Sequence, residues 1–205
     1  MALSANALTT LAKARSYLGL GTDTSKDTDI EDLIERASDF LKSQTNRNFA
    51  KTNYTEKKEG NNTDRIMLDN YPVTAITSLT YNDEALTLDT DYELEAAAGI
   101  LYKEDLWYKT GVYAGLADRI AFAKKNITVV YTAGYVLPGA ATVQIPRTLP
   151  YDIEEACIQL VQFYFKTDIS NFSTVFGEGG QVFRPSALPS HVKLIINNYK
   201  KRRAG

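Results

Sequence analysis

The spacing of apolar residues changes twice along the chain and divides it into three segments. In residues 1–50 the spacing is helical, and a first helix is predicted over about residues 6–17, ended by Gly19 and Gly21. Thr28 and Glu31 have capping-box spacing, so we predict that Thr28 caps a second helix. Its apolar positions form the single face of an amphipathic helix: Ile30, Leu33, Ile34, Ala37 and Leu41.

Residues 51–149 change to alternating apolar and polar positions, the period of a β-strand. We predict a hairpin over 57–69, a strand over 73–81 with a turn at 82–83, paired strands at 92–94 and 100–102, and a strand from 127 that Gly134 ends. An aromatic group at Trp107, Tyr108 and Tyr113 fits strand packing better than a sugar site. The segment is therefore predicted to be an inserted antiparallel β module.

Helical spacing returns in residues 150–205. Asp152 and Glu155 have capping-box spacing, so Asp152 is predicted to cap this helix. Its apolar stripe consists of Ile153, Ala156, Cys157, Leu160, Val161 and Tyr164. Phe163 and Phe165 lie off the stripe, which indicates cover on a second side by the chain's own fold or by a neighbouring subunit. A loop over 168–187 leads to a last helix predicted to begin near Pro189, followed by a basic tail.

Together these patterns predict an α+β fold, in which a small bundle of about four helices carries an inserted antiparallel β module. The expected parts are residues 1–50, 51–149 and 150–205. At 44% hydrophobic and 23% charged residues, the composition is that of a globular chain. No apolar run reaches the roughly 18 residues of a membrane-spanning helix, and the N-terminus lacks a secretory signal, so we expect no membrane partner. A single cysteine, Cys157, fits a reducing compartment.

The sequence offers little material for catalysis or cofactor binding. Its single histidine, His191, is expected on the surface at the start of the last helix. Cys157 lies on an apolar stripe, which keeps a thiol protonated and unreactive. Glu154 and Glu155 are explained by the preference for negative charge in the first turn of a helix. We therefore expect no catalytic residue, no cofactor and no metal site.

Two features point instead to binding partners. Residues 1–178 contain all 25 acidic residues but only 17 of the 23 basic ones. The sequence therefore has an acidic body followed by a basic end. The residues expected to contact a partner through charge are Lys200, Lys201, Arg202 and Arg203. Those expected at a subunit or partner interface are Phe163, Phe165, Phe172, Phe176 and Phe183. The last three lie in the 168–187 loop, which is long enough to suggest a function, although packing on its own domain explains it equally well.

The order of several motifs resembles that of a known protein family. The motifs are Asp32–Leu41 (DLIERASDFL), Thr45–Phe49 (TNRNF), Tyr71–Leu79 (YPVTAITSL), Thr128–Tyr135 (TVVYTAGY), Ile145-Pro146, Asp152–Val161 (DIEEACIQLV) and Phe183–Pro189 (FRPSALP). In this order they resemble the head–tail connector proteins of tailed phages, also called adaptor or head-completion proteins. The sequence differs from compact members of that family by extra strand-like material across residues 82–126.

The resemblance implies a ring, usually of 12 copies, at the head–tail junction of a virion assembled in a bacterial cytoplasm. Such rings dock beneath the portal protein, extend the DNA channel, and form a platform for a stopper or tail-completion protein; the family has no catalytic residues. An acidic body agrees with this expectation, because a channel for double-stranded DNA in transit should not bind phosphate tightly. Two alternatives stay open: a tail-side completion or joining protein, and a nucleic-acid-binding accessory protein acting through the basic tail.

Overall fold

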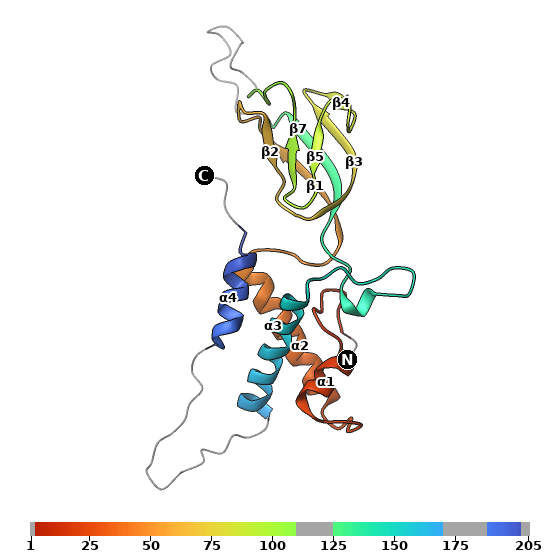
Figure 1. Cartoon of the computed structure of the whole chain (residues 1–205), viewed down its shortest axis with the longest axis vertical. Coiled ribbons are helices and arrows are strands. Elements are labelled where there is room, and N and C mark those ends of the chain that lie inside the picture. Colours follow the sequence, from red (N-terminus) through yellow and green to blue (C-terminus); the bar gives the residue numbers. More distant parts are fainter. Residues whose placement is uncertain (1–2, 110–124, 170–187, 202–205) are drawn as a thin grey trace. The chain divides into compact units, whose positions relative to one another are not determined.

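The computed structural model describes residues 3–109, 125–169 and 188–201 of the chain (Figure 1). The chain forms two compact units. A helical unit combines the residues up to Ala50 with those from Tyr135 onward, and a β unit spans Lys51–Gly134. We had expected the β module to extend to residue 149, whereas residues 135–149 belong to the helical unit. No helix in the described ranges is long and apolar enough to cross a membrane.

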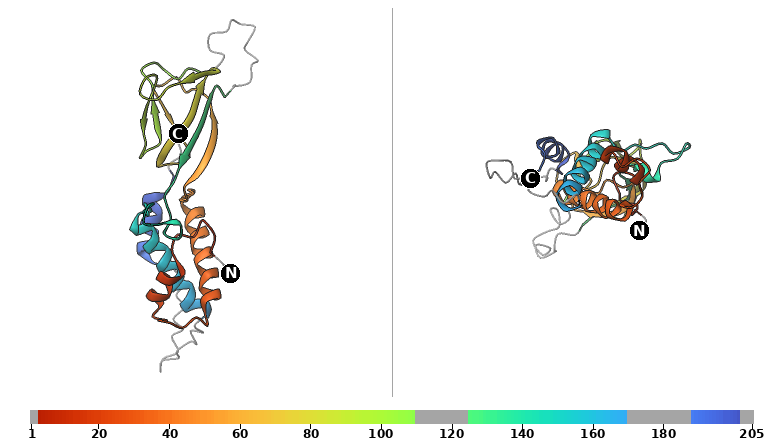
Figure 2. Two further views of the ribbon diagram at one scale, coloured as in Figure 1. Left: turned by 90° about the vertical axis from the view of Figure 1, so that its right-hand side faces the viewer. Right: turned by 90° about the horizontal axis from the view of Figure 1, so that it is seen from below.

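The helical unit contains four α-helices within the described residues: α1 (Leu11–Leu18), α2 (Asp27–Thr45), α3 (Tyr151–Tyr164) and α4 (Ser190–Tyr199). Helix α2 packs against α1, α3 and α4, and Figure 2 shows it beside α3. The apolar face predicted for α2 is buried, with Ile30, Ile34 and Ala37 fully inaccessible. Most of the predicted stripe of α3 is also in this core: Ile153, Ala156, Cys157, Leu160 and Val161. Helix α4 adds Val192, Ile195 and Ile196.

Both predicted capping boxes are wrong. Helix α2 begins at Asp27 and α3 at Tyr151, so their N-cap residues are Lys26 and Pro150, each two residues before the predicted cap; neither makes a side-chain cap. Pro150 has the extended backbone (φ −55°, ψ 141°) that precedes a helix, so Asp152 is already inside the first turn. Its carboxylate accepts hydrogen bonds from the Ile153 amide and from the Tyr199 hydroxyl, which joins α3 to α4.

Helix α1 is shorter than the predicted 6–17 because Thr10 caps it. The Thr10 hydroxyl accepts a hydrogen bond from the Lys13 amide at 3.3 Å, so the helix begins at Leu11. The predicted break after it is confirmed: Gly19 has φ 71°, a left-handed conformation that glycine adopts without a steric penalty.

The described residues of the β unit form two antiparallel sheets. The first has the order β1 (Thr52–Lys58), β7 (Ile127–Ala133), β3 (Val73–Tyr81) and β4 (Glu84–Leu86). The second has the order β2 (Arg65–Met67), β6 (Ile100–Tyr102) and β5 (Glu93–Glu95). The α+β fold class predicted from the sequence is confirmed.

The predicted hairpin over residues 57–69 is wrong, because β1 pairs with β7 whereas β2 pairs with β6. Between them the chain passes from one sheet to the other at Gly60. A Cβ atom there would lie 2.2 Å from the Tyr108 carbonyl oxygen, so only glycine fits. The Gly60 amide also donates to the Asn126 side chain at 3.0 Å, which anchors the crossing.

The other strand predictions are confirmed. Strand β3 has the predicted bounds, and Asn82 and Asp83 form the turn to β4 with φ values of 52° and 67°. Strands β5 and β6 pair on either side of Gly99. Trp107 is fully buried 5.3 Å from the Tyr81 ring, which supports strand packing; Tyr113 lies outside the described residues.

Tyr131 in β7 anchors a polar network beneath the first sheet. Its hydroxyl donates to the Glu56 carboxylate and accepts a hydrogen bond from the Asn70 amide at 3.2 Å. Burial, followed by the hydrogen bond to Glu56, raises the pKa of Tyr131 well above its usual value. The phenol therefore stays protonated and serves as a structural donor.

Candidate interaction surfaces

The residues considered for catalysis lie in unreactive positions. His191 is exposed at the second residue of α4. Cys157 is fully buried in α3, where desolvation raises the pKa of its thiol to about 12. The thiol is therefore protonated at neutral pH, as predicted. Within the part of the chain that the structure describes, no group of three or more histidine, cysteine, aspartate or glutamate residues is arranged to hold a metal ion.

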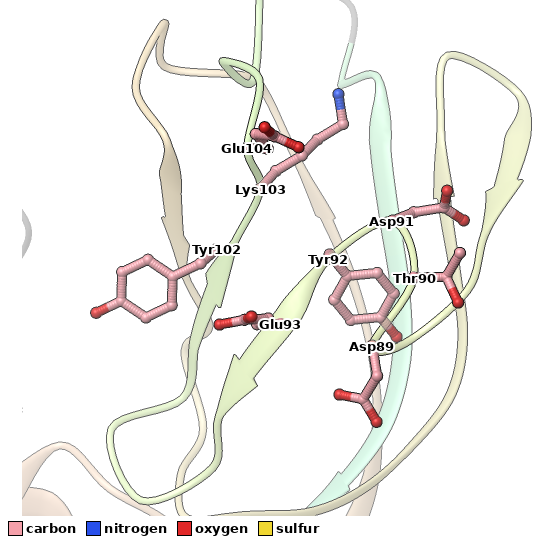
Figure 3. A pocket seen from close by; sticks show the side chains of 8 residues that line it. All are labelled: Asp89, Thr90, Asp91, Tyr92, Glu93, Tyr102, Lys103 and Glu104. Atoms are coloured by element: carbon pink, nitrogen blue, oxygen red, sulfur yellow. The ribbon is translucent and has the colours of Figure 1, made fainter.

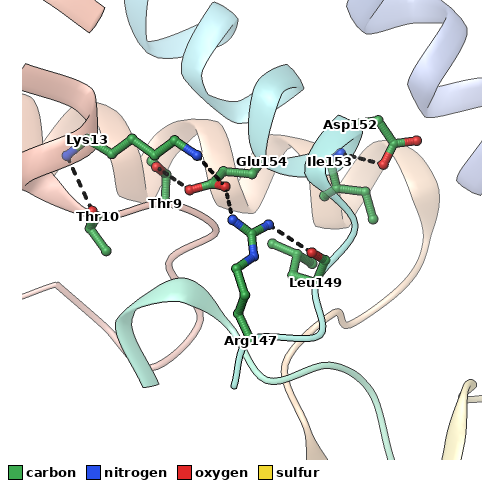
Figure 4. A network of polar contacts seen from close by, with 8 residues as sticks. All are labelled: Thr9, Thr10, Lys13, Arg147, Leu149, Asp152, Ile153 and Glu154. Carbon is green, nitrogen blue, oxygen red and sulfur yellow. Dashed lines mark hydrogen bonds and ion pairs between the residues drawn. The ribbon is translucent and has the colours of Figure 1, made fainter. Parts of the chain in front are cut away.

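Glu154, in the first turn of α3, forms a buried polar centre (Figure 4). Its carboxylate accepts hydrogen bonds from Thr9 at 3.2 Å and Lys13 at 2.7 Å, and from the Arg147 guanidinium. Burial alone would raise the pKa of Glu154, but the bonds and charges of Lys13 and Arg147 outweigh it and hold the pKa below the usual value of 4.5. One carboxylate thus connects the segment before α1, helix α1 and the segment before α3.

This centre was not predicted from the sequence, where the preference for negative charge in a helix first turn accounted for Glu154 and Glu155 alike. Glu154 is fully buried, whereas Glu155 is partly exposed and accepts a hydrogen bond from Gln159. A signal was available: Ile158 lies four residues after Glu154 and Phe165 eleven, so that side of α3 also carries apolar residues. Ile158 is buried and Phe165 packs against the core.

Residues 138–146, here called the 138–146 loop, project from the helical unit in Figure 1 and in the right-hand view of Figure 2. At its base, the Val136 amide donates to the Thr148 hydroxyl at 2.8 Å, and the Val136 carbonyl accepts from the Thr148 amide at 3.1 Å. At its tip, the Thr142 amide donates to the Ile145 carbonyl at 2.8 Å. The side chain of Val143 is 95% exposed and that of Ile145 is 57% exposed.

A basic aromatic group lies next to the base of this loop. Arg147 donates to the Leu149 carbonyl at 2.8 Å as well as to Glu154. Its guanidinium is 4.2 Å from the centre of the Tyr151 ring, and the Lys13 ammonium is 5.8 Å from the same ring. Tyr151 is 72% exposed. An exposed aromatic ring beside two cations is a surface suited to a protein partner.

The structure places two of the phenylalanines expected at an interface. Phe165 is partly buried against the core of the helical unit, and Phe163 is partly buried with its ring 5.9 Å from that of Tyr164. For Phe165, cover by the chain's own fold is thus present. Phe172, Phe176 and Phe183, with most of the 168–187 loop, lie outside the described residues.

Of the basic tail, the structure describes Lys200 and Lys201. Lys200 is exposed and is the C-cap residue that follows α4. The Lys201 amide donates to the Thr45 carbonyl at 2.8 Å, so the start of the tail is tied to the last residue of α2. Arg202 and Arg203 lie outside the described residues.

A hollow of about 400 Å³ lies on the β unit and is lined by Asp89, Thr90, Asp91, Tyr92, Glu93, Tyr102, Lys103 and Glu104 (Figure 3). One of its acidic side chains has a structural role: Asp91 accepts a hydrogen bond from the Thr87 amide at 2.7 Å. Tyr102 points away from Tyr92 and donates to Glu95 at 3.0 Å. The lining side chains therefore do not converge on a common ligand position.

Comparisons with known proteins match the chain to one protein family and to solved structures. A family model described as "Head completion protein" matches residues 7–202. Among solved structures, the neck of an empty gene transfer agent (GTA) particle with C6 symmetry matches with a TM-score of 0.55 and 16% identity, covering 100% of this chain and 94% of the other. The neck of the native particle with C12 symmetry matches with a TM-score of 0.55, 15% identity and the same coverage. None of the curated protein sequences compared with the chain matches it.

Proposed function

Because the chain belongs to the head completion protein family, we propose that it is a ring-forming connector at the head–tail junction of a phage-like particle. The observation that carries this proposal is the family match across residues 7–202. The full-length likeness to proteins of a gene transfer agent neck supports it at the level of the fold. The role is structural and not enzymatic, in keeping with the buried, protonated Cys157 and the exposed position of His191.

The proposed connector is a homo-oligomeric ring, of 12 copies when it sits on the portal. The neck of the native gene transfer agent particle has C12 symmetry, which supports this copy number for the similar chain described here. Double-stranded DNA passes through the ring. Every acidic residue lies before position 179, and this acidic body limits the attraction between the inner surface of the ring and the DNA phosphates.

The basic tail is proposed to bind an acidic surface of the portal protein. Lys201 is held at the end of α2 by its bond to Thr45, so the residues after it start from a fixed point of the helical unit. Charge pairs across such a contact steer association and fix its orientation. The opposite side of the ring is then free to receive a stopper or tail-completion protein.

Purified particles test this function directly. The chain should be present in particles, and an image of the neck should show it as a ring beneath the portal. A variant that ends at Tyr199 should fold and give the same circular dichroism spectrum, yet bind purified portal more weakly than the full chain. Particles without the chain would refute the proposal, and capture by tail-tube protein but not by portal would favour the tail-side alternative. Salt-sensitive DNA binding that is lost on truncation would favour the accessory-protein alternative.

A further inference from the structure

We propose that the helical unit binds a second copy of the chain head to tail, with the 138–146 loop of one copy against the outer face of α2 of the next. This inference rests on the proposed ring and names the contact that closes it. The loop supplies an apolar tip and a basic base, and α2 supplies an acidic surface with an aromatic flank.

The 138–146 loop has the properties of a preformed binding element. None of its nine residues is charged, although 23% of the chain is. Val143 and Ile145 expose 95% and 57% of their surface, so apolar area is displayed to water on a projecting segment. Hydrogen bonds at Thr148 fix its base, and one at Thr142 fixes its tip. A loop that is already ordered loses little conformational entropy when it binds.

The base of the loop is positive. Lys13 and Arg147 share the single carboxylate of Glu154, which leaves one uncompensated positive charge at this point. Lys13 is the more accessible cation, with 36% of its side chain exposed against 19% for Arg147. The exposed Tyr151 ring lies beside both. An acidic surface that approaches the loop would therefore be attracted to its base.

The outer face of α2 offers the matching surface within the same helical unit. Residues 27–39 contain six carboxylates and one cation, Arg36; Asp27 and Asp29 form ion pairs with Arg15 and Lys26, which leaves Asp32 and Asp39 as the exposed carboxylates on either side of Arg36. Asp32 and Asp39 are exposed and lie seven residues apart, on one side of the helix. Phe40, next to Asp39, is only partly buried and provides apolar area beside these charges.

Several observations favour a second copy as the partner. The exposed tip of the loop is apolar and uncharged, so it offers DNA phosphates no partner, and only the base beside it is positive. The two surfaces differ in charge and belong to one compact unit, so each copy carries both halves of the contact. Two different complementary faces on one chain make a heterologous contact, and repeating such a contact generates a closed ring when the rotation allows it.

Two variants of the full chain test the contact. The loop variant, Val143→Ser with Ile145→Ser, removes the apolar tip and keeps the hydrogen bonds of the turn. The acceptor variant, Asp32→Lys with Asp39→Lys, reverses the charge of the α2 surface. Each should weaken self-association at least about tenfold, measured by native mass spectrometry and light scattering. Leu194→Ser on α4, which removes an apolar side chain of 57% exposure elsewhere, is the control and should associate as the wild type does.

The decisive measurement mixes the two variants. The loop variant keeps an intact α2 surface, and the acceptor variant keeps an intact loop. A mixture should therefore form a one-to-one pair that neither protein forms alone, and this pair cannot add further copies because its two remaining surfaces are the mutated ones. A mixture that remains monomeric at high concentration would overturn the head-to-tail contact, as would a loop variant that assembles like the wild type. If wild-type protein is found in the neck of particles and the loop variant enters it equally well, the contact is refuted while the connector function stands.

Discussion

The Glu154 centre predicts a specific loss of stability in the variant Arg147→Met. Glu154 exposes 1% of its side chain, so its charge cannot reach water when Arg147 is removed. Leaving a buried charge without its partner costs about 3–5 kcal/mol. Here Lys13 and Thr9 still hold the carboxylate, at 2.7 Å and 3.2 Å, so the expected cost is that of a charged hydrogen bond, about 2 kcal/mol.

Urea unfolding measures this loss with two separate probes. Circular dichroism at 222 nm reports the helical unit, whereas the fluorescence of Trp107, the only tryptophan, reports the β unit. Arg147→Met should move the circular dichroism transition to lower urea. Lys26→Met is the matched control, because its partner Asp29 is 47% exposed and such a pair contributes no more than about 0.5 kcal/mol. Equal effects of the two variants would refute the view of Glu154 as a buried, charged anchor.

The same centre predicts a dependence on pH. The pKa of Glu154 is lower in the folded chain than its usual value of 4.5, so the stabilisation is fully present above that value and is lost as the pH falls through the folded pKa. The stability difference between the wild type and Glu154→Gln should therefore be constant near neutral pH and become smaller below about 4.5. A difference that grows with acid would contradict the assigned charge.

Other predictions concern the cores of the two units. Cys157 should not react with a thiol reagent at pH 8 in the folded chain, because burial raises its pKa to about 12, but should react fully in urea; rapid labelling of the folded chain would contradict its burial. Gly60→Ala should destabilise the β unit by about 1–3 kcal/mol in the fluorescence transition, whereas Gly139→Ala in the helical unit, with no atom within 4 Å of the new Cβ, should leave the circular dichroism transition unchanged. Tyr131→Phe should cost about 1–2 kcal/mol in the fluorescence transition, because the Glu56 carboxylate loses a buried donor; an unchanged midpoint would show that water replaces the hydroxyl.

The sequence predicted those parts of the fold in which one face of an element is buried. The i, i+4, i+7 pattern of Ile30, Ile34 and Ala37 identified the inner face of α2, and the alternation along residues 127–133 identified β7, whose odd-numbered residues are all buried. Such patterns are local, because one buried face leaves its period in the sequence.

Features that depend on distant contacts could not be read in this way. The capping-box spacings at Thr28 and Asp152 are present in the sequence, but both helices start two residues earlier than predicted, because Lys26 and Pro150 occupy the N-cap positions. The crossing at Gly60 depends on the backbone of Tyr108, far along the chain. For Glu154, the spacing to Ile158 and Phe165 indicates the buried side, but not that Arg147 and Lys13 meet the carboxylate there.

The place where the β unit joins the helical unit has a consequence for how such chains can evolve. Ala50 and Tyr135 form a β-bridge, and the Tyr135 amide donates to the Phe49 carbonyl at 2.7 Å. The chain therefore leaves the helical unit and returns to it at neighbouring positions, which the helical unit itself holds together. Because the ends of the insertion are already fixed, its length affects loop closure only weakly, by about 0.6 kcal/mol for each doubling. The β unit can thus be enlarged, shortened or exchanged for another domain while the helices stay the same.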